Sequence, residues 1–206
     1  MVHYVSNQHS LHKSKILKND LILFNQKMCY YKFNLYQKNY SWNGSRACKK
    51  KNLISPQWIR DIKPKKYPKW RLDTYFSNHK YSNICFINDG GWHFSYLNTP
   101  ELIEQKLKSY THHREYDLNP IGIENIEDRI RNKMSVYNLS SDKRENQFAK
   151  GVKLEIMENN DLPSYITHNL KKYDWQKEHL PNQTGSENSY HPKKYNNAVK
   201  KKYKSW

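Results

Sequence analysis

The chain has 206 residues, of which 36% are apolar, so it can form one domain of moderate size or part of a larger one. Its 36 Lys and Arg residues against 19 Asp and Glu give a formal net charge of +17, which favours polyanions or anionic lipid surfaces as partners. No run approaches the roughly 18 apolar residues of a membrane-spanning helix, and the first residues do not open a signal peptide. This argues against a membrane-spanning protein, and we expect a soluble one in the cytoplasm or in an unknown compartment.

The cysteines and the basic C-terminal segments indicate little about cofactors or partners. Cys29, Cys48 and Cys85 match no zinc or redox spacing. Residues 190–195 and 200–206 alternate lysine with aromatic rings, a pattern that suits single-stranded nucleic acid. The whole chain is rich in Lys, Asn, Tyr and Ile, however, as proteins from A·T-rich genomes are. Nucleic acid is therefore the disfavoured partner.

The first part of the chain predicts a lead-in, a buried strand region and a short helix. Residues 1–19 are polar, and we expect a poorly ordered lead-in there. Residues 21–35 are dominated by large apolar and tyrosine side chains, which favours buried strands. Ser55 is a good N-cap and Pro56 a good first helical residue, so a short helix is predicted over 55–62. A basic loop with two prolines follows at 63–69.

Residues 84–97 predict two strands around a glycine-rich turn. The strands are expected at 84–87 and 92–97, with the turn at Asn88–Gly91. The paired glycines release the backbone, so that Trp92, His93 and a hydroxyl can line one cleft. The alternative interpretation is a hairpin turn beside a buried tryptophan and a hydrogen-bonded core histidine.

The remaining elements are mostly helical. Thr99 can cap a helix from Pro100 to Tyr110. Apolar residues recur at helical spacing over 123–137 and predict a helix with a core-facing stripe. The alternation in 152–157 is typical of an edge strand, and residues 176–206 are predicted to be a basic disordered tail.

Several short segments follow one another in an order that points to one family. They are Phe24–Leu35, Trp42–Cys48, Gly91–Tyr96, Thr99–Glu101, Lys106–His112 and Leu162–Ile166. Together they resemble glycosyltransferase family 17, the β-1,4-mannosyl-glycoprotein 4-β-N-acetylglucosaminyltransferase family, which adds the bisecting GlcNAc to N-glycans. The resemblance covers one family-like domain, residues 20–175.

The resemblance implies an α/β chain of GT-A-like glycosyltransferase architecture. Family members carry, ahead of the matched region, a nucleotide-binding half whose acidic Asp-x-Asp-Glu-Ile-Pro-like motif holds a divalent metal, Mn²⁺ or Mg²⁺, and the donor diphosphate. No such motif occurs in this sequence, where Asp20 is the isolated first acidic residue. We therefore expect the C-terminal portion of the family domain, incomplete at the N-terminal nucleotide-binding half, with that missing half as a partner.

Sugar transfer needs charge neutralisation at the leaving diphosphate, a base and an acceptor-orienting surface. His93 is the candidate late metal ligand, because imidazole ligates Mn²⁺. Asp89 and Glu115 are the candidate catalytic bases, although Asp89 also suits a turn and Glu115 a helix-end charge. Aromatic residues in a strand also fill cores, and helical lysines also form solvated faces. The candidate substrate-binding residues are Trp92, Ser95, Tyr96, Lys106, His112 and Arg46.

The activity implied by the resemblance is inverting transfer of N-acetylglucosamine, or a related sugar, from a UDP-sugar donor to a glycan acceptor in protein N-linked glycosylation. Because the acidic motif is absent, we expect this polypeptide to be inactive alone. The alternative is a non-catalytic basic protein that binds glycan or nucleic acid.

Overall fold

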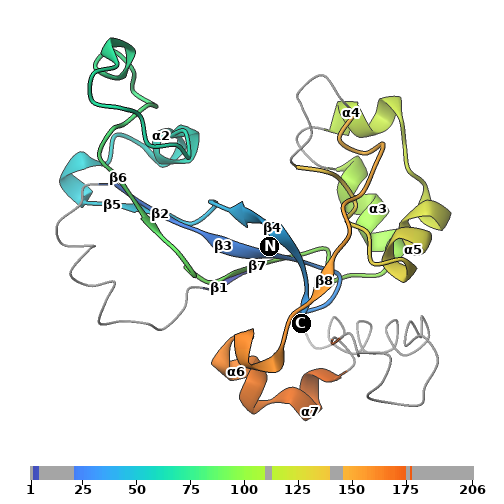
Figure 1. The fold of residues 1–206 in the computed structure, drawn as a ribbon. Helices are drawn as coiled ribbons and strands as arrows, with labels where there is room; N and C mark the ends of the chain where they lie inside the picture. The colour runs from blue at the N-terminus through green and yellow to red at the C-terminus, as the bar shows by residue number, and fades with distance from the viewer. Residues whose placement is uncertain (1, 5–20, 110–112, 140–145, 175–176, 178–206) are drawn as a thin grey trace. The chain divides into compact units, whose positions relative to one another are not determined.

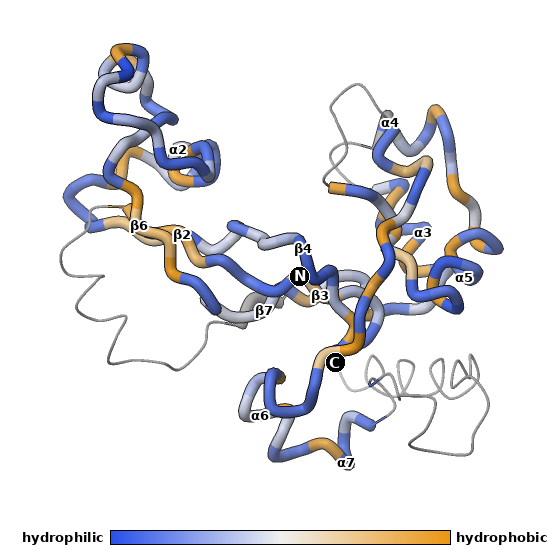
Figure 2. The backbone as a smooth tube through the Cα atoms, in the orientation of Figure 1, coloured by the Kyte–Doolittle hydropathy of each residue, from blue (hydrophilic) through white to orange (hydrophobic). Residues whose placement is uncertain are grey.

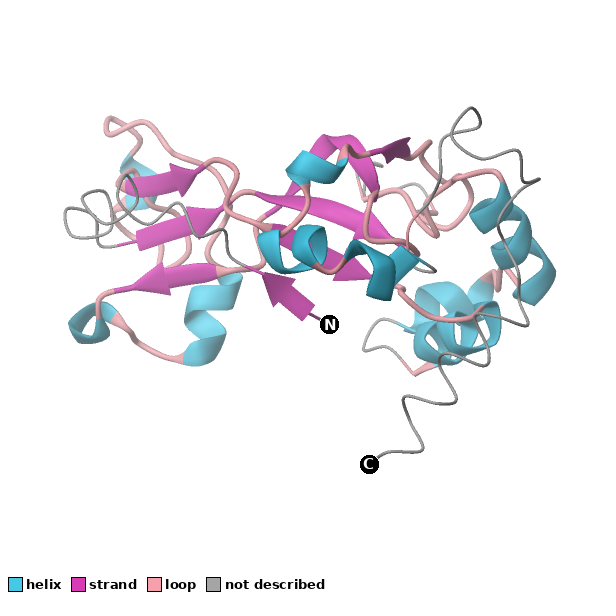
Figure 3. Ribbon diagram, turned by 90° about the horizontal axis from the view of Figure 1, so that it is seen from below, coloured by secondary structure: helices cyan, strands magenta, loops and turns pink. Residues whose placement is uncertain are grey.

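The computed structural model describes residues 2–4, 21–109, 113–139, 146–174 and 177. These residues combine strands, short helices and long connections (Figures 1 and 3), which confirms the predicted α/β class. The chain divides into two compact units. Unit 1 comprises residues 1–27 and 41–93, and unit 2 comprises residues 28–40 and 94–206. The range 20–175, for which the resemblance implies one domain, contributes to both units.

The strands of the described residues form two sheets. One sheet has five strands in the order β1-β7-β3-β4-β8, and the other has three in the order β5-β2-β6. Strands β3, β4 and β7 each have residues in both units. The strand bounds are β1 Val2–Tyr4, β2 Leu21–Phe24, β3 Gln26–Tyr30, β4 Leu35–Trp42, β5 Arg46–Cys48, β6 Ile84–Ile87, β7 Trp92–Ser95 and β8 Glu155–Ile156.

The helices are short and lie mostly in unit 2. Their bounds are α2 Pro56–Asp61, α3 Pro100–Lys108, α4 His113–Leu118, α5 Ile123–Arg131, α6 Ser164–His168 and α7 Leu170–Tyr173, with 3₁₀ turns η1 Lys50–Asn52, η2 Leu72–Thr74 and η3 Asn159–Asp161. Among the described residues, no helix is both long enough and apolar enough to cross a membrane.

The core of unit 1 forms around β2. This strand pairs in parallel with β6, from Leu21 opposite Ile84 to Phe24 opposite Ile87, and antiparallel with β5. Figure 2 shows β2 and β6 as hydrophobic segments. The buried strands predicted over 21–35 are confirmed by β2 and β3. The core cluster consists of Leu21, Leu23, Trp58, Ile62 and Ile84.

Helix α2 begins and ends as its sequence predicts. The Ser55 hydroxyl accepts a hydrogen bond from the Trp58 backbone N–H at 3.0 Å, and Pro56 occupies the first turn. The buried Trp58 indole donates to the Asn78 carbonyl at 2.7 Å. That bond ties the segment between α2 and β6 to the core of unit 1.

Helix α3 is confirmed from its cap through Lys108, and the predicted last residue, Tyr110, lies outside the described residues. The Thr99 hydroxyl accepts from the Leu102 backbone N–H at 3.4 Å. Ile103 and Leu107 are buried, and α3 packs against α4 and α5. The apolar face of α3 therefore contributes to the core of unit 2.

The predicted helix over 123–137 is correct at its start and wrong at its end. Helix α5 buries Ile126 and Ile130 but ends at Arg131. Lys133 has φ 53°, a left-handed conformation that does not continue an α-helix. Met134 then forms a bridge with Lys153, so the end of the apolar stripe belongs to an extended connection.

The predicted edge strand over 152–157 is confirmed as the two-residue β8. It pairs antiparallel with β4, Leu35 opposite Ile156, at one edge of the five-stranded sheet. The predicted lead-in, apart from β1, and the predicted tail, apart from residue 177, lie outside the described residues.

Candidate functional site

The turn after β6 combines two glycines with an unusual aspartate. Gly90 lies so close to β2 that a Cβ atom would be 2.7 Å from that of Phe24, and Gly91 has φ 119°. Asp89, the first candidate base, is exposed and has φ 51°. Its position shows the turn role that the sequence also allowed.

This turn does not close a hairpin. The strands on either side of it, β6 and β7, are confirmed, but they belong to different sheets. The cause is the neighbouring segment of the same chain, between β2 and β3. The Asn25 N–H donates to the Ile87 carbonyl at 2.9 Å, and the Lys27 N–H donates to the Gly91 carbonyl at 2.9 Å. β6 and β7 are therefore both bonded to the β2–β3 segment instead of to each other.

Three asparagine amides hold this end of unit 1 together. The Asn25 amide donates to the Asn88 side-chain oxygen at 2.8 Å, and the Asn43 amide donates to the Asn25 side-chain oxygen. Asn25 precedes β3, Asn43 follows β4, and Asn88 follows β6. The cluster therefore links three separate connections of the chain.

His93, the candidate metal ligand, lies in the interior of unit 1. Its side chain is completely buried, and its ring stacks on the Trp42 indole with centroids 4.8 Å apart and planes at 29°. Trp92, a candidate substrate contact on the same strand, is half-buried. Among the described residues, no group of three or more His, Cys, Asp or Glu side chains is placed to hold a metal ion.

Arg46, another candidate substrate contact, is occupied within unit 1. Its guanidinium donates to the carbonyls of Asn43, Ile59, Arg60 and Ile62 at 2.6–3.0 Å. Three of these carbonyls belong to the end of α2 or the residue after it, where helix carbonyls lack intrahelical partners. The observed contacts of Arg46 thus close the C-terminus of α2.

Tyr96 is a buried member of an aromatic cluster in unit 2. Its ring lies parallel to that of Tyr30, with centroids 6.4 Å apart, and meets Tyr137 edge-on at 5.8 Å. Burial raises the pKa of Tyr30 far above its ordinary value, so its hydroxyl stays neutral. Tyr96 itself has φ 56°. Ser95, beside it, is buried, and its carbonyl accepts from the Tyr31 N–H at 3.2 Å.

Lys106 meets Tyr96 in space. Its ammonium lies 4.1 Å from the centre of the Tyr96 ring, within the range of a cation–π interaction. Lys106 is half-buried, and this burial lowers the pKa of its ammonium. Two of the predicted substrate-binding residues, ten positions apart in sequence, are thus in contact.

A surface pocket of about 400 Å³ opens beside Lys106. Amide, hydroxyl and ammonium groups supply its polar lining, and none of its lining residues is acidic. This volume lies within the range of roughly 300–1,000 Å³ typical of small-molecule sites. The lining residues are Asn98, Leu102, Gln105, Lys106 and Ser109.

The two remaining candidates are not placed by the structure. Glu115 belongs to α4, but its side chain is outside the described part of the molecule. His112 lies wholly outside the described residues. The candidates Asp89, Trp92, His93 and Arg46 belong to unit 1, whereas Ser95, Tyr96 and Lys106 belong to unit 2.

Sequence reasoning missed the polar companions of Lys106 in the pocket. Gln105 and Ser109 lie one residue before and three residues after it, and Asn98 precedes the Thr99 cap. The available signal was helical spacing, because residues three and four apart share one helix face. In unit 1, the stacking of Trp42 on His93 had no local sequence signal.

Comparison of the chain with protein-family models, with curated proteins and with solved structures gave no match.

Proposed function

We propose that the chain is a glycosyltransferase-like protein whose pocket beside α3 binds a sugar or nucleotide-sugar. The implied reaction is inverting transfer of N-acetylglucosamine, or a related sugar, from a UDP-sugar to a glycan acceptor. The motif resemblance over residues 20–175 supports this proposal. The observation that carries it is the position of Lys106, from one matched motif, which lines the pocket and has its ammonium 4.1 Å from the ring of Tyr96, from another.

The chemistry of the pocket suits such a ligand. Asn98 and Gln105 offer amide donors and acceptors, and Ser109 offers a hydroxyl, which together match the vicinal hydroxyls of a sugar. Lys106 offers a cation to a phosphate oxygen. Its ammonium is held against an aromatic ring instead of extending freely into solvent, so less side-chain entropy is lost when an anion binds.

A divalent metal, Mn²⁺ or Mg²⁺, is the cofactor that the resemblance implies. His93 is the residue assigned to it, and its complete burial against Trp42 does not fit a ligand open to a donor diphosphate in this conformation. No catalytic step of this proposal therefore runs through a metal.

A second candidate function is non-catalytic glycan binding. The composition of the pocket favours it, because amides, a hydroxyl and an ammonium line the space without a carboxylate that would act as an acceptor base. Both candidates use the same lining residues, and a transfer assay separates them.

The test measures binding and turnover on the full chain. We expect UDP-GlcNAc, observed by ligand-detected NMR, to bind wild-type protein and to bind Lys106→Met at least about fivefold more weakly. Lys108→Met is the matched control, because Lys108 is exposed on the same helix and pairs with Glu104 at 3.1 Å.

The same samples, supplied with Mn²⁺ and a glycan acceptor, report transfer as UDP release. Binding with UDP release supports the transferase, and binding of free GlcNAc without release supports the second candidate. Absence of binding by UDP-GlcNAc, UDP and GlcNAc, or equal loss in Lys106→Met and Lys108→Met, would overturn the proposal.

A further inference from the structure

The segment between α2 and β6 exposes an unusual number of large apolar side chains. We call residues 63–80 the basic aromatic loop. Within it, Trp70 is 81% exposed, Leu72 73%, Tyr75 72% and Phe76 90%. Isolated exposed hydrophobic residues are normal, but four within seven consecutive residues indicate an interaction site.

The loop is closed by backbone hydrogen bonds between its two arms and the residue that follows it. The Lys63 N–H donates to the His79 carbonyl at 2.8 Å, and the Tyr67 N–H donates to the Tyr81 carbonyl at 3.2 Å. These bonds join the outgoing and returning arms. The exposed side chains between them are therefore presented by a closed loop.

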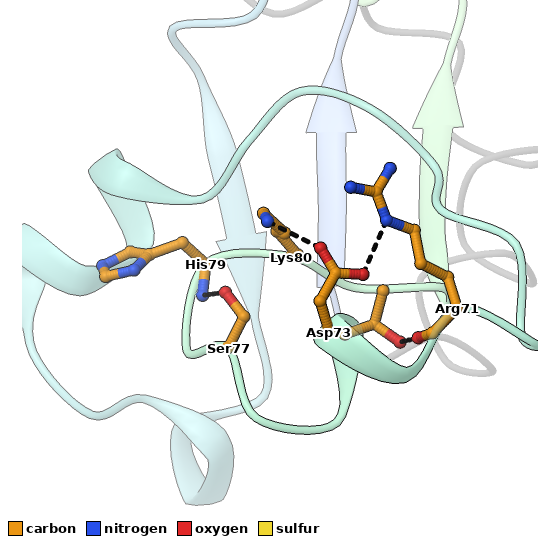
Figure 4. Close-up of polar contacts among 6 residues, drawn as sticks. Arg71, Asp73, Ser77, His79 and Lys80 are labelled. Carbon is orange, nitrogen blue, oxygen red and sulfur yellow. Dashed lines mark hydrogen bonds and ion pairs between the residues drawn. The ribbon is translucent and has the colours of Figure 1, made fainter.

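An acidic residue and an aromatic ring organise the cations of the loop. Asp73 accepts from Arg71 at 2.6 Å and from Lys80 at 2.7 Å (Figure 4). The Tyr67 ring has Lys65, Arg71 and Lys80 at 5.3–6.0 Å from its centre. Asp73 thus neutralises part of a cationic cluster beside Tyr67, in the same loop as the exposed apolar residues.

The loop as a whole is strongly basic. It contains five Lys and one Arg against the single carboxylate of Asp73. Lys63, Lys66 and Lys69 are exposed along it. Clustered basic residues near a surface attract anionic lipid headgroups, and each residue adds to the attraction.

We propose that the basic aromatic loop is a membrane-docking element that inserts Trp70, Leu72 and Phe76 into the headgroup region of an anionic bilayer. The cations of the loop would bind lipid phosphates or carboxylates, and Trp suits the interface because its ring is apolar and its N–H polar. The loop would hold the protein on the surface of the bilayer without spanning it.

Lipid is favoured over single-stranded nucleic acid by the kind of side chain exposed. Nucleic-acid surfaces of this type use aromatic rings as stacking platforms for bases. Leu72 has no such face, yet it is 73% exposed among the aromatic residues. An aliphatic side chain gains from transfer into hydrocarbon but not from base stacking.

The decisive variant removes hydrophobicity without changing charge. Trp70→Ser combined with Phe76→Ser keeps the formal charge of +17, so general attraction to anionic vesicles is retained. With phosphatidylcholine vesicles that contain about 30% phosphatidylserine, at about 0.15 M salt, we expect the double variant to partition at least roughly tenfold less than wild type in sedimentation. Leu118→Ser, at a 79% exposed leucine in α4, is the matched control and should bind like wild type.

A second pair of variants tests the charge. Lys66→Gln with Lys69→Gln should weaken binding roughly tenfold or more, whereas Lys150→Gln with Lys171→Gln, which removes the same charge from exposed positions elsewhere, should weaken it clearly less. Circular dichroism of each variant checks the fold, which changes at such exposed positions should leave intact.

Three results would overturn the proposal. One is equal vesicle binding by wild type and Trp70→Ser/Phe76→Ser. Another is a loss confined to binding of a single-stranded oligonucleotide, which would assign the loop to nucleic acid. The third is a loss confined to self-association in sedimentation velocity, which would assign the loop to a second copy of the chain.

Discussion

Two tyrosines in this protein lie beside cations in very different surroundings. In unit 2, Tyr96 is buried among Tyr30 and Tyr137, and one ammonium, that of Lys106, lies 4.1 Å from its ring. In unit 1, Tyr67 is half-buried, and its ring has three cations at 5.3–6.0 Å.

From this difference we expect burial, and not the number of cations, to decide the strength of such a pair. A cation partly removed from water interacts strongly with an aromatic face, whereas cations on an exposed loop are screened by water and salt. The Lys106 pKa is lowered because burial penalises its charge. The pair at Tyr96 therefore suits a defined pocket, and the cluster at Tyr67 suits a broad anionic surface.

Removal of the Tyr96 and Tyr67 rings, one at a time, should produce the largest difference in the free energy of unfolding. Tyr96→Ala removes a buried ring from the aromatic cluster, and we expect it to lower the free energy of unfolding by about 3–5 kcal/mol. Tyr67→Ala leaves a surface position and should cost about 1 kcal/mol or less. Urea denaturation followed by far-UV circular dichroism measures both. Similar losses for the two variants would contradict the difference in burial.

Loss of the cap of α3 tests whether that helix holds Lys106 in place. Thr99→Ala removes the acceptor for the Leu102 N–H and should cost about 1 kcal/mol, and Ser55→Ala at α2 should cost a similar amount. Thr99→Ala should also weaken ligand binding at the pocket, while Ser55→Ala should not. Equal effects of the two variants on ligand binding would show that the cap of α3 does not hold the pocket residues in place.

The titration of Lys106 should appear as a dependence of stability on pH. Because the folded-state pKa lies below the ordinary value of 10.5, the unfolded chain holds the proton more tightly over the window just below 10.5. Wild-type stability should therefore rise relative to Lys106→Met as the pH increases through that window. Chemical denaturation of both proteins at pH 8 and above measures the difference. If the difference in free energy of unfolding between the two proteins stays constant with pH, the ammonium is not desolvated in the folded state.

The ion pairs of Asp73 should have the smallest effect on stability. Hydrogen bonds from Lys80 and Arg71 lower the pKa of this carboxyl below 3.8, so its contribution is present above that pH and is lost as the pH falls through the lowered pKa. Asp73→Asn should slightly lower the melting temperature at pH 7, and the difference from wild type should shrink in acid and at high salt. A difference that grows in acid would contradict the pairing.

The parts of the fold that could be predicted are those with local causes. Ser55 with Pro56, and Thr99 with Pro100, specify two helix starts through short-range hydrogen bonds and backbone geometry. Sheet membership could not be predicted in this way. That β6 and β7 join different sheets depends on residues about 60 positions earlier in the chain.

Backbone conformations rare for their residue types account for other differences. The predicted end of the helix over 123–137 was wrong because Lys133 adopts a left-handed conformation that lysine seldom shows, while the apolar pattern continues past it. At the candidate site, Tyr96 and Lys106 were each predicted as substrate contacts, but not as partners. Their contact depends on the backbone at Tyr96, where φ is 56°. No local pattern predicts this conformation for a tyrosine.

The linked amides of Asn25, Asn43 and Asn88 have a consequence for the chemical ageing of the protein. Asn43 is followed by Gly44, whose lack of a side chain leaves its backbone nitrogen free to attack the Asn43 side-chain carbonyl, which expels ammonia and forms the succinimide that water opens in deamidation. Conversion of the Asn43 amide to a carboxylate would delete the donor to Asn25 and set a negative charge against its oxygen. One slow hydrolysis during storage would thus break one of the two amide hydrogen bonds that join the three chain connections.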